Sequence, residues 1–268
     1  LQLSNPGAYF ANKFQNLIYK NNIRRGITTT EKLDKVDFDK AMKFYNERFS
    51  NAGDFTFVFV GNLNVEKMKP MLETYLGGLP STNTKETWKD AGITKKEGDV
   101  ISKVEMGKTP KDLVGIHFHG DVNWNDEDNY IFNSMVKVLS IQLREAMRED
   151  KGGVYGVGVN GAFVQRPKNE YGITIQFNTD PVRVEELVKT VYENIELLKK
   201  DGPTTEKITK VQETQRRERE TDLKENEFWL SKIQYFDEYN YDINNLADYN
   251  KQIDGLTAEK VKAAFNKY

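Results

Sequence analysis

The segment over residues 143–159 constrains the fold most, because a helical period of apolar residues changes there to a strand period. Upstream, apolar residues recur at three- and four-residue steps and predict a long amphipathic helix: Ile131, Phe132, Met135, Val136, Leu139, Leu143 and Met147. Gly152 and Gly153 end this helix, because glycine takes the left-handed conformation without a Cβ penalty. From Val154 the period drops to two, which predicts a strand with one apolar face: Tyr155, Val157, Val159 and Phe163.

The corner carries two candidate site residues, Arg148 in the last helical turn and Tyr155 at the start of the strand. A guanidinium and a phenol at one tight corner could both point at a bound peptide backbone. The alternative is that the arginine is solvated or paired, and that the tyrosine packs its ring and leaves its hydroxyl in water. Arg144 and Arg148 are a like-charged i,i+4 pair, so helix electrostatics do not explain the choice of arginine. Spacing alone leaves both interpretations open.

Composition excludes several classes of protein. At 268 residues the chain is long for one core and comfortable for two domains. Its 39 basic and 41 acidic residues leave a formal charge of -2, which calls for neither nucleic acid nor an anionic membrane as partner. Without cysteine it has no disulfide and no thiolate zinc site. No apolar run approaches the roughly 18 residues that span a bilayer. The start at Leu1, without a methionine or a signal-peptide pattern, indicates a processed protein or an excised fragment.

The first 99 residues predict helices, one strand and a linker. Apolar spacing predicts a helix over residues 6–21, and further helices begin at the N-cap residues Asp37 and Asn64. Residues 55–60 are β-branched and aromatic on both faces, which predicts a central strand covered on at least one side. Residues 81–99 are mostly polar and predict a linker. The predicted domains are therefore 1–80 and 100–268.

Residues 113–119 alternate strictly and predict a strand whose polar face carries His117 and His119. With Asp121 nearby these histidines could hold a metal, but zinc needs three or four ligands and no further one is specified. A polar strand face needs no metal to justify histidine, so no metal site is predicted. Downstream, residues 171–177 predict the second strand of an antiparallel hairpin, and Asp180 opens the next helix. The charged run over residues 216–220 predicts a solvated helix face rather than a basic patch.

The sequence matches itself at an offset of about 220 residues, where residues 253–266 align with residues 33–46. Three residues of the second segment are identical to their partners, and the two N-caps Asp37 and Thr257 coincide. The chain is therefore predicted to hold parts of two copies of one α/β unit. Chance similarity between lysine-rich helices is the alternative.

Residues 44–62, 75–80 and 143–155, in this order, resemble the pitrilysin and insulysin type of zinc metallopeptidase, metallopeptidase family 16. The resemblance extends from about Asn5 to the C-terminus and includes residues 226–230. It implies an α+β fold of two related α/β units, each a mostly antiparallel sheet covered by helices, as in the mitochondrial processing peptidase. Complete enzymes of this type have four such domains, which form two halves that close around a peptide.

The resemblance also implies that the zinc site and the residues that contact the substrate backbone lie in different halves of the enzyme. The N-terminal half of such enzymes carries zinc on the motif His-x-x-Glu-His, which this chain lacks because its only histidines are two residues apart. The chain looks like the C-terminal, non-catalytic half, in which Arg148 and Tyr155 match an arginine and a tyrosine that contact the substrate backbone. We expect no metal, cofactor or activity in this chain alone, and zinc in the complete enzyme.

The expected partners are an N-terminal catalytic half of the same polypeptide and a peptide substrate, with neither nucleic acid nor a membrane span. Bacterial relatives imply a periplasmic or cell-envelope location. Relatives without the zinc motif serve as structural subunits of larger assemblies, so a non-catalytic assembly subunit is the alternative function.

Overall fold

The computed structural model describes residues 2–82, 84–152 and 154–268. The chain divides into two compact units. Unit 1 consists of Leu1–Gly26, Asp90–Arg216 and Asp248–Tyr268, and unit 2 consists of Ile27–Lys89 and Arg217–Ala247. Each unit thus combines segments that are far apart in the sequence. The division into sequence domains at residues 81–99 stays a prediction.

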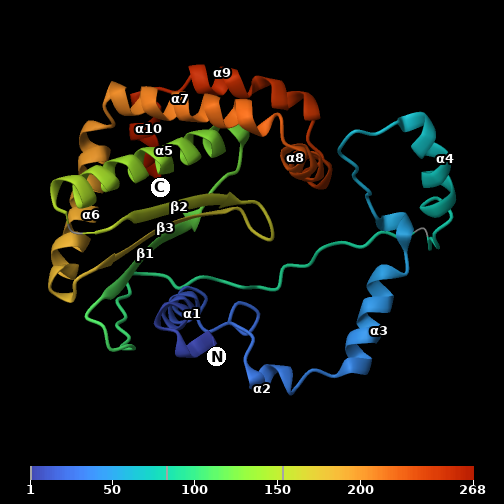
Figure 1. Ribbon diagram of the computed structural model, residues 1–268, viewed down its shortest axis with the longest axis horizontal. Helices are drawn as coiled ribbons and strands as arrows, with labels where there is room; N and C mark the ends of the chain where they lie inside the picture. Colours follow the sequence, from blue (N-terminus) through green and yellow to red (C-terminus); the bar gives the residue numbers. More distant parts are fainter. Residues whose placement is uncertain (1, 83, 153) are drawn as a thin grey trace. The chain divides into compact units, whose positions relative to one another are not determined.

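A three-stranded antiparallel sheet lies at the centre of unit 1 (Figure 1). Its strands are β1 (Asp112–Asp121), β2 (Val157–Val164) and β3 (Glu170–Thr179), in the order β1-β3-β2. Ile175 of β3 lies opposite Ile116 of β1 and Val159 of β2, so the apolar residues of the three strands share one face. The predicted hairpin formed by β2 and β3 is confirmed.

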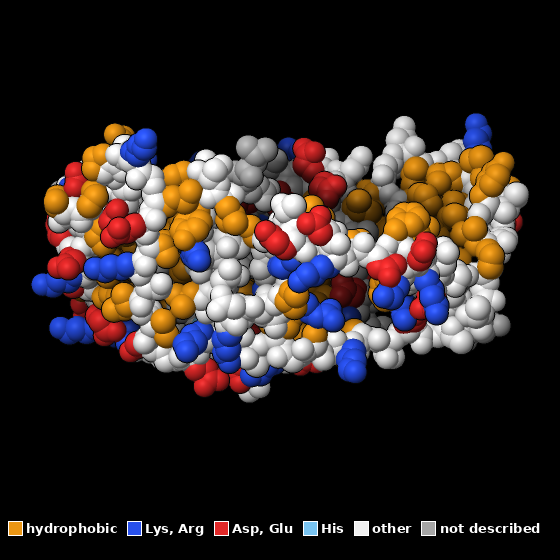
Figure 2. Space-filling view, turned by 90° about the horizontal axis from the view of Figure 1, so that it is seen from below, with side chains coloured by type: hydrophobic (Ala, Val, Ile, Leu, Met, Phe, Trp, Pro, Cys, Tyr) orange, Lys and Arg blue, Asp and Glu red, His pale blue; other side chains and the backbone are white. Residues whose placement is uncertain are grey.

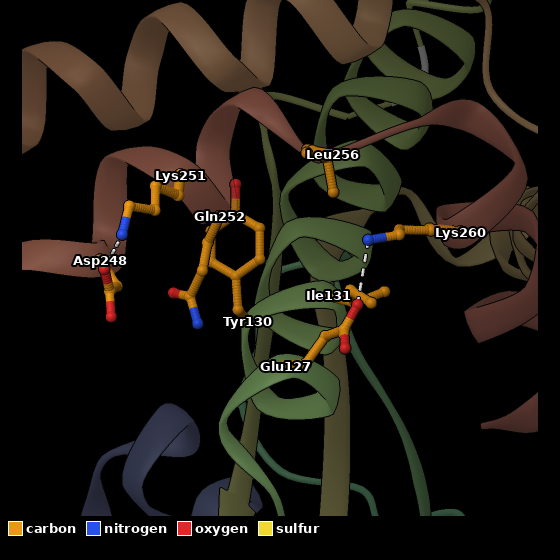
Figure 3. Close-up of a pocket in the computed structure, with 9 residues that line it drawn as sticks. Glu127, Tyr130, Ile131, Asp248, Lys251, Gln252, Leu256 and Lys260 are labelled. Atoms are coloured by element: carbon orange, nitrogen blue, oxygen red, sulfur yellow. Dashed lines mark hydrogen bonds and ion pairs between the residues drawn. The ribbon is translucent and has the colours of Figure 1, made fainter. Parts of the chain in front are cut away.

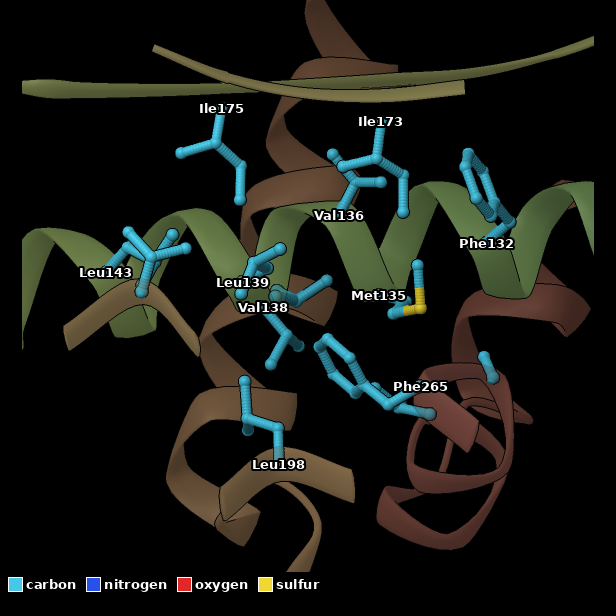
Figure 4. Packing of buried hydrophobic residues seen from close by; sticks show 14 of the residues in the cluster. Phe132, Met135, Val136, Val138, Leu139, Leu143, Ile173, Ile175, Leu198 and Phe265 are labelled. Atoms are coloured by element: carbon cyan, nitrogen blue, oxygen red, sulfur yellow. The ribbon is translucent and has the colours of Figure 1, made fainter. Parts of the chain in front are cut away.

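Helix α5 (Asp126–Arg144) covers the apolar face of the sheet. It begins where the Asn125 side chain accepts a hydrogen bond from the Asp128 N–H at 2.8 Å. Figure 4 shows Ile173 and Ile175 pointing toward α5, while Leu198 and Phe265 approach it from the other side. Full burial of one such side chain contributes roughly 1.5–3 kcal/mol, so this layer is the main stabilising feature of unit 1.

The remaining helices of unit 1 complete its layers. Behind α5 lie α6 (Val184–Asp201) and α10 (Ala258–Lys267), with α9 (Tyr249–Asp254) and most of α7 (Thr205–Asp222) beside them. Helix α1 (Pro6–Ile18) lies on the opposite side of the sheet, against β1. There the rings of Phe10 and Phe14 approach Gly115 so closely that an added Cβ would lie 3.0–3.2 Å from them. Glycine at this position therefore allows α1 to pack flat on the strand.

Unit 2 is built from helices without an apolar core. Its helices are α2 (Thr30–Leu33), α3 (Phe38–Phe49), α4 (Val65–Tyr75) and α8 (Asn226–Tyr239). The predicted caps Asp37 and Asn64 are confirmed, since each accepts a hydrogen bond from the N–H three residues on, at 3.0 and 2.9 Å. Among the described residues, every buried hydrophobic side chain belongs to unit 1. Figure 2 shows hydrophobic side chains gathered on the surface over the part of unit 2 that holds α3 and α4.

The predicted central strand at residues 55–60 is wrong for this structure, which forms no strand there. Phe55, Phe57 and Phe59 are 37%, 45% and 47% exposed. The physical reason is the lack of a partner, because all strands among the described residues belong to the sheet of unit 1. Composition favours a strand, but only pairing forms one.

The helices follow the internal repeat. At the offset of about 220 residues, α1, α2 and α3 coincide in order, and within a few residues in their bounds, with α8, α9 and α10. The caps of α3 and α10 are also equivalent, since Asp37 and Thr257 each accept from the N–H of the lysine three residues on. The fold is α+β, as predicted.

Candidate functional site

The candidate site is the corner between α5 and β2, which differs in detail from the sequence prediction. A π-helical segment, Glu145–Asp150, follows α5 directly. Gly152 ends it with a positive φ of 57°, and its N–H donates to the Arg148 carbonyl at 3.1 Å. The role predicted for Gly152 is thus confirmed, while Gly153 lies outside the described residues. Single π-helical turns are rare and frequently lie at functional sites, which gives the corner a second distinguishing feature.

Arg148 and Tyr155 each follow a buried anchor. Met147 is completely buried and Val154 is 8% exposed, whereas Arg148 is exposed and Tyr155 is 90% exposed. The two polar side chains thus extend into solvent, each from a position next to a buried anchor. The Arg148 side chain makes no hydrogen bond or ion pair with any side chain that the structure describes.

The placement of Tyr155 on the strand was wrong, because β2 begins only at Val157. Gly156 and Gly152 flank the tyrosine, and glycine weakens a strand. From Val157 onward the predicted alternation is confirmed, with odd-numbered residues as far as Phe163 more buried than their neighbours. The Tyr155 ring instead contacts the ammonium group of Lys111, 5.8 Å from the ring centroid. Its hydroxyl is therefore not tied into the sheet.

Three charged residues hold the corner, and we call them the Lys151 buttress: Lys151, Arg183 and Glu186. The Arg183 guanidinium donates to the Lys151 carbonyl at 3.3 and 3.4 Å and to the Glu186 carboxylate at 3.1 and 3.2 Å. The Lys151 ammonium group also donates to Glu186, at 3.2 Å. The hydrogen bonds from Arg183 hold the pKa of Glu186 below its usual range. The buttress thus fixes the position of the Lys151 carbonyl, three residues after Arg148.

Sequence reasoning missed the buttress because its members lie on different elements. Arg183 follows the helix start predicted at Asp180, and its i,i+3 spacing from Glu186 was the available local signal. The contact of both residues with Lys151 depends on how β3 returns the chain to the corner. No local pattern specifies that return.

The histidines of β1 do not form a metal centre. His117 Nδ1 bonds to the Thr174 hydroxyl at 2.9 Å, His119 Nε2 donates to the Lys96 carbonyl at 2.9 Å, and Asp121 pairs with Lys168 at 2.6 Å. Among the residues that the structure describes, no three metal-ligating groups come together. Burial beneath α1, together with the nearby Lys95 ammonium group, lowers the pKa of His117 to about 4. A neutral, packed histidine at neutral pH fits a structural role.

A separate hollow of about 300 Å³ lies between the start of α5, α9 and α10 (Figure 3). Glu127 pairs with Lys260 at 3.0 Å on one side of Tyr130, and Asp248 pairs with Lys251 at 2.5 Å on the other. Because these charges neutralise each other within the wall, they offer a ligand little net charge. The hollow lies apart from the corner in the sequence and shares no residue with it.

In the described parts of the chain, no helix combines the length and the apolar character needed to cross a lipid bilayer.

Comparison with known proteins places the corner inside a recognised family segment. The family model described as "Peptidase M16 inactive domain" matches residues 35–215. The chain is 26% identical over 246 residues to a "Zinc protease PQQL-like" of Arabidopsis thaliana, covering 85% of this chain and 25% of the relative. It is 27% identical over 182 residues to a "Probable zinc protease PqqL" of Haemophilus influenzae, covering 66% of this chain and 19% of the relative.

The fold has a close counterpart among solved structures. The crystal structure of the periplasmic protease PqqL from Escherichia coli superposes with a TM-score of 0.83 at 19% identity. The match covers all of this chain and 30% of that protein. The chain thus spans about a quarter of the length of its curated relatives, or less.

Proposed function

This chain belongs to the family of peptidase M16 inactive domains, and from that membership we propose that it is the peptide-binding, non-catalytic part of a zinc-dependent endopeptidase. The two curated relatives described as zinc proteases support the reaction class. The observation that carries the proposal is the corner, where Arg148 and Tyr155 each extend into solvent one residue after a buried anchor.

In the proposed function, Arg148 and Tyr155 hold the backbone of an extended peptide. A guanidinium presents several N–H donors in a fixed fork and a phenol presents one O–H donor, and both suit peptide carbonyl oxygens. Hydrogen bonds that involve a charged donor contribute about 1.5–3 kcal/mol. Two such contacts position a peptide and align its scissile bond without recognising particular side chains.

Hydrolysis is assigned to a half of the protein outside these residues. The sequence contains two histidines, at positions 117 and 119, so it cannot contain His-x-x-Glu-His. One ring nitrogen of each histidine is also already hydrogen-bonded, His117 to the Thr174 hydroxyl and His119 to the Lys96 carbonyl, and is not free to bind zinc. In the catalytic half zinc supplies an activated water molecule. Residues 1–268 supply binding and orientation, and we expect them to cleave no peptide alone.

The periplasmic location of the Escherichia coli relative supports a bacterial periplasmic or envelope location for the complete protein. Fractionation of cells with a tagged complete protein tests this part of the proposal, and recovery in the cytoplasm would contradict it.

The main test uses the complete protein and the variants Arg148→Ala and Tyr155→Phe. We expect kcat/KM for an unstructured peptide to fall about 10- to 100-fold for Arg148→Ala and less for Tyr155→Phe, with zinc content unchanged. Arg144→Ala is the matched control, because Arg144 is also exposed but lies one helical turn before Arg148. Equal kinetics for Arg148→Ala and Arg144→Ala would remove the site assignment. Absence of any peptidase activity or zinc in the complete protein would favour an assembly subunit instead.

A further inference from the structure

Lys111 is a third polar residue at the corner, and no pattern in the sequence singles it out. Its ammonium group lies 5.8 Å from the centroid of the Tyr155 ring, within the roughly 6 Å over which a cation and an aromatic ring attract each other. Lys111 is exposed and Tyr155 is 90% exposed, so this pair of side chains stands in solvent. The corner therefore presents a cation on the face of its tyrosine.

The sheet brings Lys111 and Tyr155 together, although they are far apart in the sequence. Lys111 directly precedes β1, and the first residue of β1 lies opposite the last residue of β3, Thr179. Tyr155 lies two residues before β2, whose first residue lies opposite Phe177 of the same strand. The Lys111 N–H also donates to the Thr109 carbonyl at 2.8 Å, which forms a turn ahead of β1. Both residues thus lie at one end of the sheet, on the two strands that flank β3.

The Lys111 ammonium group forms no ion pair with a carboxylate among the residues that the structure describes. Glu186, a carboxylate of the same corner, is already bonded to the other two residues of the Lys151 buttress. Asp180 accepts from a backbone N–H at the start of the next helix, at 3.0 Å. A lysine has three N–H donors, so Lys111 can bind a carboxylate from a ligand without losing its contact with the ring.

We propose that Lys111 makes the corner select peptides that carry a carboxylate close to the carbonyl group bound by Tyr155. The selection rests on the proposed function, because it names the class of peptide that the corner binds. The hydroxyl and the ring of Tyr155 form one rigid group, so a carbonyl that accepts from the hydroxyl lies near the ammonium group on the ring. The flexible four-carbon stem of lysine lets this group follow a carboxylate a few bonds away. Arg148 then recognises the peptide backbone, and Lys111 recognises charge.

The carboxylate has two sources, the side chain of an aspartate or glutamate and the free C-terminus of the peptide. A series of unstructured peptides separates them: a single glutamate or glutamine is moved along one sequence, and each peptide is made with a free or an amidated C-terminus. Residues 1–268 are titrated with each peptide, and Kd is measured from the NMR shifts of the Tyr155 ring. We expect the best-placed carboxylate to lower Kd about 1.5- to 5-fold at low salt, as for ion pairs near a surface. The preference should vanish near about 1 M salt.

Three variants assign the preference to one side chain: Lys111→Gln, Lys111→Glu and the matched control Lys108→Gln. Lys108 is exposed as well and lies three residues before Lys111, so its substitution removes the same charge from the same surface. Lys111→Gln should make the affinities for charged and neutral peptides equal, and Lys111→Glu should reverse their order. Lys108→Gln should leave the preference as it is. A preference that persists in Lys111→Gln, or that Lys108→Gln reduces equally, overturns the proposal.

The same titrations separate a failure of this selection from a failure of peptide binding at the corner. Arg148→Ala should weaken every peptide of the series by a similar factor, whereas Lys111→Gln should weaken only those with the carboxylate. Both substitutions are at exposed positions, so the Tm of residues 1–268 should not change. Equal binding of all peptides would overturn the selection by Lys111 alone. Binding of none of them would contradict the proposed function and the selection together.

Discussion

Units 1 and 2 contain equivalent helices in different surroundings. In unit 1, α10 lies against α5 and α6, and Val261 and Phe265 are buried. In unit 2, α3 begins at the equivalent position with the same kind of cap, yet Phe44 and Tyr45 remain exposed. Local sequence therefore specifies the helix, whereas burial depends on packing against a helix that covers a sheet, an arrangement that the described residues form in unit 1. Stability should be distributed just as unevenly, and the following experiments measure that difference.

The largest expected effect comes from a matched pair of leucine substitutions. Leu139 is 2% exposed in the core of unit 1, and Leu33 is 59% exposed in unit 2. Leu139→Ala should lower the free energy of unfolding by about 3 kcal/mol, because it removes buried contacts and leaves a cavity. Leu33→Ala should change it by less than about 0.5 kcal/mol. Denaturant titrations check both, and equal losses would show that unit 2 has a core of its own.

A buried polar pair gives a smaller difference. Tyr130 donates to Gln215 at 2.7 Å and Gln215 donates to Ser134 at 2.9 Å, all buried in unit 1. In unit 2, Asn51 donates to the Thr84 carbonyl at 2.7 Å. Gln215→Ala should lower the free energy of unfolding by about 2 kcal/mol, because it removes the acceptor of the buried Tyr130 hydroxyl and the donor to the Ser134 hydroxyl, which keeps its hydrogen bond to the Tyr130 carbonyl. Asn51→Ala should cost about 1 kcal/mol in local hydrogen-exchange stability, and a larger loss at Asn51 would reverse the comparison.

The smallest expected effect depends on pH. The folded pKa of His117 is about 4, below its ordinary value of 6.5, so the unfolded chain binds a proton first as the pH falls. The free energy of unfolding of unit 1 should therefore fall by about 1–2 kcal/mol between pH 6.5 and pH 4, after allowance for the partial exposure of His117. His117→Gln should flatten this part of the stability curve. Parallel curves for the two proteins would exclude His117 as the cause. Unit 2 contains no histidine, so its stability should not show this fall between pH 6.5 and pH 4.

Many of the helices and strands could be predicted because their signals are local. The apolar stripe of α5, the alternation of β2 and β3, and the caps at Asp37 and Asn64 all correspond to observed elements. The strand at residues 55–60 was wrong because a strand exists only when another strand pairs with it. Tyr155 was placed two residues too far into a strand because the glycines beside it hold the chain in a bend.

The candidate site shows the same limit. The corner follows from the change of period at residues 143–159, but the exposure of Tyr155 does not, because the period placed it with Val157 on the apolar face of the strand. The Lys151 buttress depends on Arg183 and Glu186, which reach the corner only through the fold of β3 and α6. Their contribution could not be read from spacing.

The central proposal is that this chain binds peptide at the corner and not at the exposed hydrophobic side chains of unit 2. NMR titration of residues 1–268 with an unstructured, uncleaved peptide tests this claim directly. We predict chemical-shift changes centred on Arg148 and Tyr155, lost in Arg148→Ala, with α3 unaffected. Shifts confined to Phe44, Tyr45 and their neighbours, with none at the corner, would contradict it.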